Sequence, residues 1–347
     1  MSRKHQPVKK RHPIRNGILS ILYIGIFIGV TSPLILFYGP YSTLKQLVVS
    51  TVMATRHQYL ITTFLSQADI DALLGKKEQT VVASSTPENA TKSPATSSTP
   101  TTDIEIKHKN STEINQYKIE HDRYIAHILE IKDPTKIKAV MTKYVGKNGQ
   151  KTSEMALDYD AIAAINGGAF ADVSASGQKW AGNGAIPGGF VITNGAIVYP
   201  KENVNKYDVQ NVVAFTKEGK LVVGDYCIND LMAMGVTEAM CFRPPSIIID
   251  GVAQITDKLQ DGTNPRTAIG QKADGTVVLL VIDGRTLSMP GATLYDVQQI
   301  FKDLNVVNAG NLDGGYSSTM YFNGEIINSP NAWSGERTVA TAFIVER

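Results

Sequence analysis

Apolar residues follow two different patterns along this chain. Residues 17–38 form one continuous apolar run without a charged side chain, whereas beyond residue 105 short apolar runs are separated by glycine, proline and asparagine. A helix over 17–38 would be about 33 Å long at ~1.5 Å per residue, enough to cross a hydrocarbon core of about 30 Å. A helix buried in a protein core usually keeps a polar face, and this segment has none. The pattern predicts a transmembrane helix over 17–38 and a folded domain over 105–347.

Basic residues crowd the N-terminal side of the apolar run. The first fifteen residues contain no acidic side chain and carry six basic ones: Arg3, Lys4, Lys9, Lys10, Arg11 and Arg15. By the positive-inside rule, this tail (1–16) stays in the cytoplasm and the C-terminal domain lies outside the cell membrane. The alternative is a cleaved signal peptide, which would have a shorter apolar region and a small-residue cleavage site soon after it. The nearest such site, residues 52–54, lies well past the run, which favours an uncleaved single-pass anchor.

Two connecting segments follow the predicted anchor. In residues 39–75 apolar side chains recur at three- and four-residue intervals, which predicts a helical stalk beside the membrane or a helix for self-association. Residues 84–102 then consist almost entirely of Ser, Thr, Pro, Ala and Asn. Such a composition buries too little apolar surface to fold. We expect 76–104 to be a disordered linker that carries the domain away from the membrane.

The C-terminal domain is predicted to be rich in strands. Alternating or β-branched runs bounded by turn residues predict strands at 124–131, 136–142, 162–166, 189–193, 196–199, 212–216, 221–223, 246–250, 266–270, 277–283, 319–322, 325–327 and 339–345. Helices are expected only at 229–234 and 293–304, the second with Thr293 as N-cap. Many strands with few helices between them predict a single α+β domain of mixed α/β structure.

Charge and cysteine content narrow the class of protein further. The net charge is +2, but without the six basic tail residues 28 of the 34 Lys and Arg remain against 32 Asp and Glu. The outer domain is therefore mildly acidic, which argues against a nucleic-acid partner. Cys227 and Cys241 are the only two cysteines. An exported domain permits a disulfide between them without requiring it.

Histidines and cysteines are too few for several common kinds of site. No histidine follows His127. A serine-histidine-aspartate triad at Ser317 or Ser318 would need His108, His121 or His127 to reach across from the start of the domain. Two cysteines do not make a tetrahedral zinc site. Carboxylates, arginines and glycine-rich loops remain as candidate chemistry.

Four segments combine a predicted strand end with glycine or polar residues: 163–170, 264–270, 281–285 and 311–320. Each alone is more often a plain turn, and a single arginine is more often in a surface ion pair. Together they contain the parts of a sugar-phosphate site. Paired glycines present backbone N–H groups to an anion, and arginine binds phosphate in a bidentate manner. Asp283 and Asp313 supply the two carboxylates that glycosidic chemistry uses.

The ordered set of segments 264–270, 283–285, 311–320 and 337–345 resembles the phosphodiester glycosidase family, whose bacterial relatives are often labelled exopolysaccharide biosynthesis proteins. The run NLDGGYSSTM, with DGR about thirty residues before it and RTVATAFIV after it, carries the resemblance. One departure is Tyr316, which stands where a third glycine is expected. Its ring would narrow the pocket or stack on a sugar. The anchor and the Ser/Thr/Pro tether are also typical of Gram-positive surface members.

The resemblance implies hydrolysis of a sugar-1-phosphodiester at the anomeric carbon. It points to Asp313 as the catalytic carboxylate, with Asp283 as a second carboxylate or a group that orients Arg285. The substrate-binding residues it implies are Asn166, Gly167, Gly168, Arg266, Thr267, Arg285, Gly314, Gly315, Ser317, Ser318 and Arg337. No metal site and no cofactor are expected. A divalent cation held by Asp250, Asp283, Asp313 or Asn311 is a less favoured alternative, because no contiguous calcium-loop pattern is present.

Two classes of function remain open from the sequence. The first is a membrane-anchored, extracytoplasmic glycosidase that acts on a phosphate-containing glycan of the cell surface. The second is a non-catalytic glycan-binding or exopolysaccharide assembly factor, in which the same arginines and glycines bind a sugar phosphate without cleaving it. The presence of both carboxylates favours the enzyme.

Overall fold

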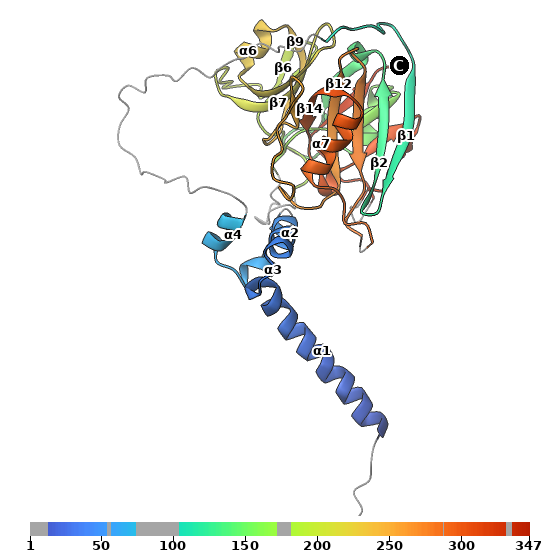
Figure 1. The fold of residues 1–347 in the computed structure, drawn as a ribbon. Coiled ribbons are helices and arrows are strands. Elements are labelled where there is room, and N and C mark those ends of the chain that lie inside the picture. Colours follow the sequence, from blue (N-terminus) through green and yellow to red (C-terminus); the bar gives the residue numbers. More distant parts are fainter. Residues whose placement is uncertain (1–12, 54–56, 74–103, 172–181, 287, 331–334) are drawn as a thin grey trace, which may run out of the picture.

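The computed structural model describes residues 13–53, 57–73, 104–171, 182–286, 288–330 and 335–347. Helix α1 (Pro13–Tyr38) contains the predicted apolar segment and points away from the folded domain (Figure 1). Gly17–Tyr38 has a mean hydropathy of 2.2, Phe37 is its only buried residue, and it is long and apolar enough to cross a membrane. A signal sequence near an N-terminus shares these features.

The segment after α1 is helical, as predicted, but it is not one continuous stalk. It contains α2 (Ser42–Met53), α3 (Tyr59–Thr62) and α4 (Gln67–Leu73). These pack around a small core formed by Phe37, Val49, Ile61, Leu65 and Ile70. The apolar spacing arises because short helices pack on one another. The predicted linker lies outside the described residues except for residue 104.

A seven-stranded antiparallel sheet forms one layer of the domain. Its strands, in spatial order, are β1 (Ile114–His121), β2 (Tyr124–Ile131), β13 (Val277–Ile282), β12 (Arg266–Lys272), β14 (Val306–Asn311), β10 (Ile248–Ile249) and β11 (Val252–Ala253). Both faces of its centre are covered, which is why every residue of β13 is apolar and buried.

Two five-stranded antiparallel sheets face this layer. One has the order β16 (Glu325–Ile326), β15 (Met320–Phe322), β4 (Ala163–Asn166), β17 (Thr341–Val345), β3 (Ile137–Met141). The other has the order β6 (Ala196–Tyr199), β5 (Val191–Thr193), β9 (Val236–Cys241), β7 (Gln210–Thr216), β8 (Leu221–Tyr226). The main core lies between the layers and includes Leu279, Ile165, Phe215 and Phe343.

Three helices cover the outer faces of these sheets. Helix α7 (Leu294–Asp303) lies across the seven-stranded sheet in Figure 1, and its Phe301 packs with Leu280 and Ile282. Helices α5 (Thr152–Asp158) and α6 (Ile228–Ala233) cover the two smaller sheets. Two 3₁₀ turns, η1 (Pro134–Lys136) and η2 (Gly315–Ser317), complete the described elements. The α+β class is confirmed.

Most predicted elements are present. The hairpin β7–β8 and the turn at Asn323 and Gly324 occur where they were expected, and Thr293 caps α7 by accepting a hydrogen bond from the Asp296 N–H. Strands β1, β9 and β14 and helix α5 were not predicted. Cys227 and Cys241 are both buried free thiols, so the optional disulfide is not formed.

Candidate active site

The candidate site is built where several strands of the two facing layers end. Asn166 is the last residue of β4 and is fully buried. Its side-chain N–H group donates to the Asp313 carbonyl (2.6 Å), and its side-chain oxygen accepts from the Thr267 hydroxyl (2.8 Å) and the Thr319 N–H (3.0 Å). One amide therefore joins β4, β12 and both sides of the 313–319 loop. Asn166 and Thr267 hold the loop of Asp313 in place.

Backbone hydrogen bonds fix the same loop from its other side. The Asp313 N–H donates to the Gly167 carbonyl (3.0 Å), and the Gly315 N–H donates to the Pro265 carbonyl (2.9 Å). Gly314 packs so closely that an added Cβ would lie 2.7 Å from the Pro265 carbonyl oxygen. Gly314 is thus favoured by the close approach of two loops, in addition to any role toward a ligand.

Arg285 lies at the centre of the predicted charged residues. It is half-buried, its guanidinium donates to the Asn264 side chain (3.1 Å), and it lies 4.4 Å from the centre of the Tyr316 ring. Burial lowers the pKa of Arg285, Tyr316 and Asp313 oppose that shift, and Arg337 adds to it. Asp313, Tyr316 and Arg337 therefore lie within electrostatic reach of one guanidinium.

Gly315 has a φ of +63°, and an added Cβ would lie 2.9 Å from the Arg285 guanidinium. The bulky residue that departs from the family pattern, Tyr316, is the next residue and supplies the ring against which the guanidinium packs. The Arg285 Nε is buried and has no hydrogen-bond partner among the described residues. A glycine and a ring thus shape the space around this arginine.

Asp283 follows β13 directly and is only 7% exposed. One of its carboxylate oxygens accepts from the Asn328 side chain (3.0 Å) and the Ser329 N–H (2.9 Å), and the other lies 2.8 Å from the His127 Nε2. Burial would raise the pKa of Asp283, but hydrogen bonds from His127, Asn328 and Ser329 outweigh it and lower the pKa. Asp283 is a buried carboxylate with a hydrogen-bond partner on each oxygen, and its lowered pKa favours the ionised form.

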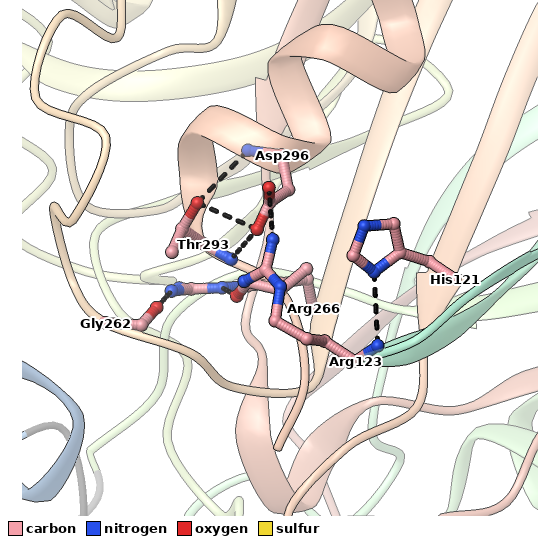
Figure 2. Close-up of polar contacts among 7 residues, drawn as sticks. His121, Arg123, Gly262, Arg266, Thr293 and Asp296 are labelled. Carbon is pink, nitrogen blue, oxygen red and sulfur yellow. Dashed lines mark hydrogen bonds and ion pairs between the residues drawn. The ribbon is translucent and has the colours of Figure 1, made fainter. Parts of the chain in front are cut away.

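Arg266 is buried at the first position of β12, close to α7 (Figure 2). Its Nε donates to the Ala292 carbonyl (2.9 Å), and one terminal nitrogen donates to the carbonyls of Asp261 (3.1 Å) and Gly262 (2.6 Å). Burial lowers the pKa of Arg266 to about 10. Most of its donors are already used by the main chain, so it holds the 261–266 loop against α7.

The remaining predicted residues lie around this centre in different roles. Arg337 donates to the Gly182 carbonyl (2.9 Å), and its guanidinium lies 4.9 Å from the centre of the Phe170 ring. Gly168 is packed against β9, where an added Cβ would lie 2.2 Å from the Cys241 carbonyl oxygen. Ser317 and Ser318 are buried, and their hydroxyls have no hydrogen-bond partner among the described residues.

The sequence did not indicate the roles of three residues that form hydrogen bonds with the predicted site residues. His127, Asn264 and Asn328 bond Asp283 or Arg285. A histidine among the apolar residues of a predicted strand was a usable signal for a buried hydrogen bond, whereas the two asparagines gave none. In the described parts of the chain no three His, Cys, Asp or Glu side chains gather as metal ligands.

Known proteins provide an independent comparison with this geometry. Residues 159–346, more than half of the chain, match the phosphodiester glycosidase family. A Bacillus subtilis protein, the SPbeta prophage-derived uncharacterized protein YomE, is 30% identical over 209 residues, which cover 57% of this chain and 29% of that protein. The bovine N-acetylglucosamine-1-phosphodiester alpha-N-acetylglucosaminidase is 38% identical over 86 residues, covering 23% of this chain and 16% of that protein.

A solved structure agrees with the fold. The catalytic domain of the zebrafish N-acetylglucosamine-1-phosphodiester alpha-N-acetylglucosaminidase, auto-inhibited by its pro-peptide, superposes with a TM-score of 0.55 at 24% identity, covering 70% of this chain and 87% of that one. The chain spans less than a third of the length of the two curated relatives. The matched segment contains every predicted site residue from Asn166 to Arg337, and the chain belongs to the phosphodiester glycosidase family.

Proposed function

We propose that this protein is a glycosidase that hydrolyses the bond between a sugar and a phosphate in a sugar-1-phosphodiester. The bovine relative is named for action on an N-acetylglucosamine-1-phosphodiester, and we take the same bond type as the target here. The substrate is a phosphate-containing glycan of the cell surface, such as a phosphopolysaccharide.

The observation that carries the proposal is the environment of Arg285. A half-buried guanidinium, with a second arginine within electrostatic reach, is suited to a phosphodiester anion. The Asp313 carboxylate within reach of the same guanidinium is suited to the positive charge that develops on a sugar ring at its anomeric carbon. A sugar bonded to a phosphate carries both features side by side.

The reaction needs few groups from the protein. Water adds to the anomeric carbon, and the bond from that carbon to the phosphate oxygen breaks with its electron pair going to the phosphate. A phosphate monoester has a second pKa of about 6, so it leaves near neutral pH without a proton from an acid. One carboxylate, Asp313, is sufficient as nucleophile or as the base that accepts the proton of water, while Arg285 and Arg337 stabilise the departing phosphate.

Other residues act through these groups. Asp283 is a positioning residue, because its three hydrogen bonds leave its carboxylate little freedom to act on a substrate. Asn166 and Thr267 position the Asp313 loop. Arg266 positions the loop that carries Asn264, the partner of Arg285.

The N-terminal part gives the enzyme its location in this proposal. We infer a cytoplasmic tail (1–16), a transmembrane anchor (17–38), a helical juxtamembrane segment (39–75), a linker (76–104) and the catalytic domain (105–347). The apolar helix and the basic tail support this order. The active site then faces the cell wall or capsule of a Gram-positive surface.

The proposal is tested by release of free sugar from a panel of sugar-1-phosphodiesters, with the full chain in detergent and with Asp313→Asn beside it. We expect turnover by the parent and a loss of about 10²- to 10⁴-fold in the variant. Turnover that survives Asp313→Asn would remove that assignment. No turnover together with retained binding of the same compounds would favour a glycan-binding or assembly factor instead.

A further inference from the structure

A concave surface lies close to the candidate active site along the chain. This hollow, of about 440 Å³, is lined by Lys143, Tyr144, Asn148, Gly149, Gln150, Glu154, Leu157, Asp158 and Thr338. Its volume is in the range of small-ligand sites, about 300–1,000 Å³. Thr338 is the residue after Arg337, so one wall of the hollow is a direct neighbour of an arginine of the candidate site.

Hydrogen bonds link the hollow to Arg337 through a single segment. The Gly149 N–H and the Thr338 hydroxyl both donate to the Asn183 carbonyl, and each donor–acceptor distance is 2.9 Å. Arg337 donates to the carbonyl of Gly182, the residue before Asn183. The floor of the hollow and the arginine are thus held by two adjacent residues of one segment, Asn183 and Gly182.

The polar wall of the hollow is held in a fixed geometry. Gln150 is only 3% exposed, accepts from the Lys143 N–H (2.8 Å) and donates to the Asp158 carboxylate (2.8 Å). The Lys143 ammonium donates to both Asp158 oxygens, at 2.8 and 2.7 Å. The buried amide fixes the position of the Lys143–Asp158 ion pair, whose side chains are 52% and 34% exposed at the surface of the hollow.

The other wall is aromatic and apolar. Tyr144 is 48% exposed and Leu157 is 67% exposed. A tyrosine offers a flat apolar face and one hydroxyl, which suits a ring that is apolar on its faces and polar at its rim. The charges of Lys143 and Asp158 balance, and Glu154 leaves the hollow with a negative excess, so an anion such as phosphate is disfavoured.

We propose that this hollow is a subsite for an uncharged sugar ring of a longer glycan whose reacting phosphodiester lies at Arg285 and Arg337. The sugar stacks on Tyr144, and its hydroxyl groups bond Lys143, Asp158 and Asn148. The inference rests on the proposed function and adds to it: the substrate is a polymer or oligomer, recognised beyond the sugar that is released.

The test compares two probes on the full chain in detergent. One is the methyl phosphodiester of N-acetylglucosamine-1-phosphate, and the other is a short oligomer of phosphodiester-linked N-acetylglucosamine. We expect Tyr144→Ala to lower the ratio of kcat/KM for the oligomer to that for the monomer by about tenfold, the usual effect of losing one well-packed aromatic contact. Tyr159→Ala is the matched control, since Tyr159 is 52% exposed and does not line the hollow.

A direct binding measurement separates this inference from the proposed reaction. Oligomer affinity is measured in the Asp313→Asn background, with and without Tyr144→Ala. Weaker oligomer binding on loss of Tyr144 would support the subsite even if the parent cleaves neither probe, in which case only the glycosidase assignment fails. An unchanged ratio and unchanged oligomer affinity, or an equal effect of Tyr159→Ala, would overturn the subsite while leaving the glycosidase intact.

Discussion

The guanidinium of Arg285 packs 4.4 Å from the centre of the Tyr316 ring, at the position where the family pattern predicts a glycine. Such a contact contributes about 0.5–2 kcal/mol, depending on exposure. If the ring holds Arg285 toward the phosphate, Tyr316→Ala should raise KM for a sugar-1-phosphodiester by about 2- to 30-fold. Tyr316→Phe, which keeps the ring, should stay close to the parent. An equal rise in KM for the two variants would show that the Tyr316 hydroxyl, and not its ring, contributes to substrate binding.

Gly315→Ala should impair catalysis through Arg285. Its φ of +63° is unfavourable for alanine, and the added Cβ would lie 2.9 Å from the guanidinium. Gly324 is the matched control, because its φ is +95° and nothing lies within 4 Å of an added Cβ. We expect both variants to lose about 1 kcal/mol of unfolding free energy, and only Gly315→Ala to lose more than tenfold in kcat/KM. Denaturant unfolding and steady-state kinetics on the two proteins separate these effects.

Asp283→Asn should destabilise the protein in a pH-dependent manner. The folded-state pKa of Asp283 is lowered by its hydrogen bonds, so its contribution is complete above the unfolded value of about 3.9 and is lost as pH falls through the folded pKa. Above pH ~4 we expect a deficit of about 2–3 kcal/mol, because a buried charged acceptor is removed. Below that pH the deficit should shrink.

Unfolding free energies measured at several pH values check this expectation. Asp122→Asn serves as control, since Asp122 is exposed in the turn between β1 and β2. The ordinary pKa of an aspartate is about 4. If the difference in unfolding free energy between Asp283→Asn and the parent does not change below that pH, the packing and hydrogen bonds of Asp283, and not its charge, explain its role.

The sequence predicts elements better than it predicts which atoms meet. Strand β13 was evident because six consecutive apolar residues fit a strand covered on both faces. Strand β14 was missed because it ends in Asn-Ala-Gly-Asn, a composition typical of turns, and is a strand only because β12 and β10 pair with it. Helix α5 has seven residues, too few to show a period.

The sequence indicates which segments carry the candidate site residues, but it does not indicate their individual contacts. The loop of Asp283 follows β13, a strand that the pattern located, whereas the loop of Asp313 follows the missed strand β14. His127, the partner of Asp283, lies 156 residues away in the sequence. The two residues are close only because β2 pairs with β13 in a register that places His127 opposite Val281. Arg266 was expected to bind phosphate, but carbonyls of a loop just before it take most of its donors. Long-range register and local loop geometry are not encoded in the spacing of residue types.

The contact between helix α2 and the 257–263 loop leads to a further prediction. Thr51 on α2 accepts a hydrogen bond from the Thr263 N–H (3.1 Å), and the Gln46 side chain donates to Asp257 (3.3 Å). Gly262 lies so close that an added Cβ would be 2.3 Å from the Thr51 hydroxyl oxygen. The next residue but one, Asn264, is the partner of Arg285.

Loss of this contact should therefore impair the activity, because Asn264 in the same loop bonds Arg285. We expect Thr51→Val, which keeps the shape and removes the acceptor, to lower kcat/KM of the full chain several-fold, because an unpaired N–H costs about 1–3 kcal/mol and loosens the loop. Thr51→Ser, which keeps the acceptor, should have the kcat/KM of the parent. Thr62→Val, on the exposed side of α3, should not change kcat/KM. If Thr51→Val changes unfolding free energy without changing kcat/KM, α2 supports the fold of the domain but does not position Arg285.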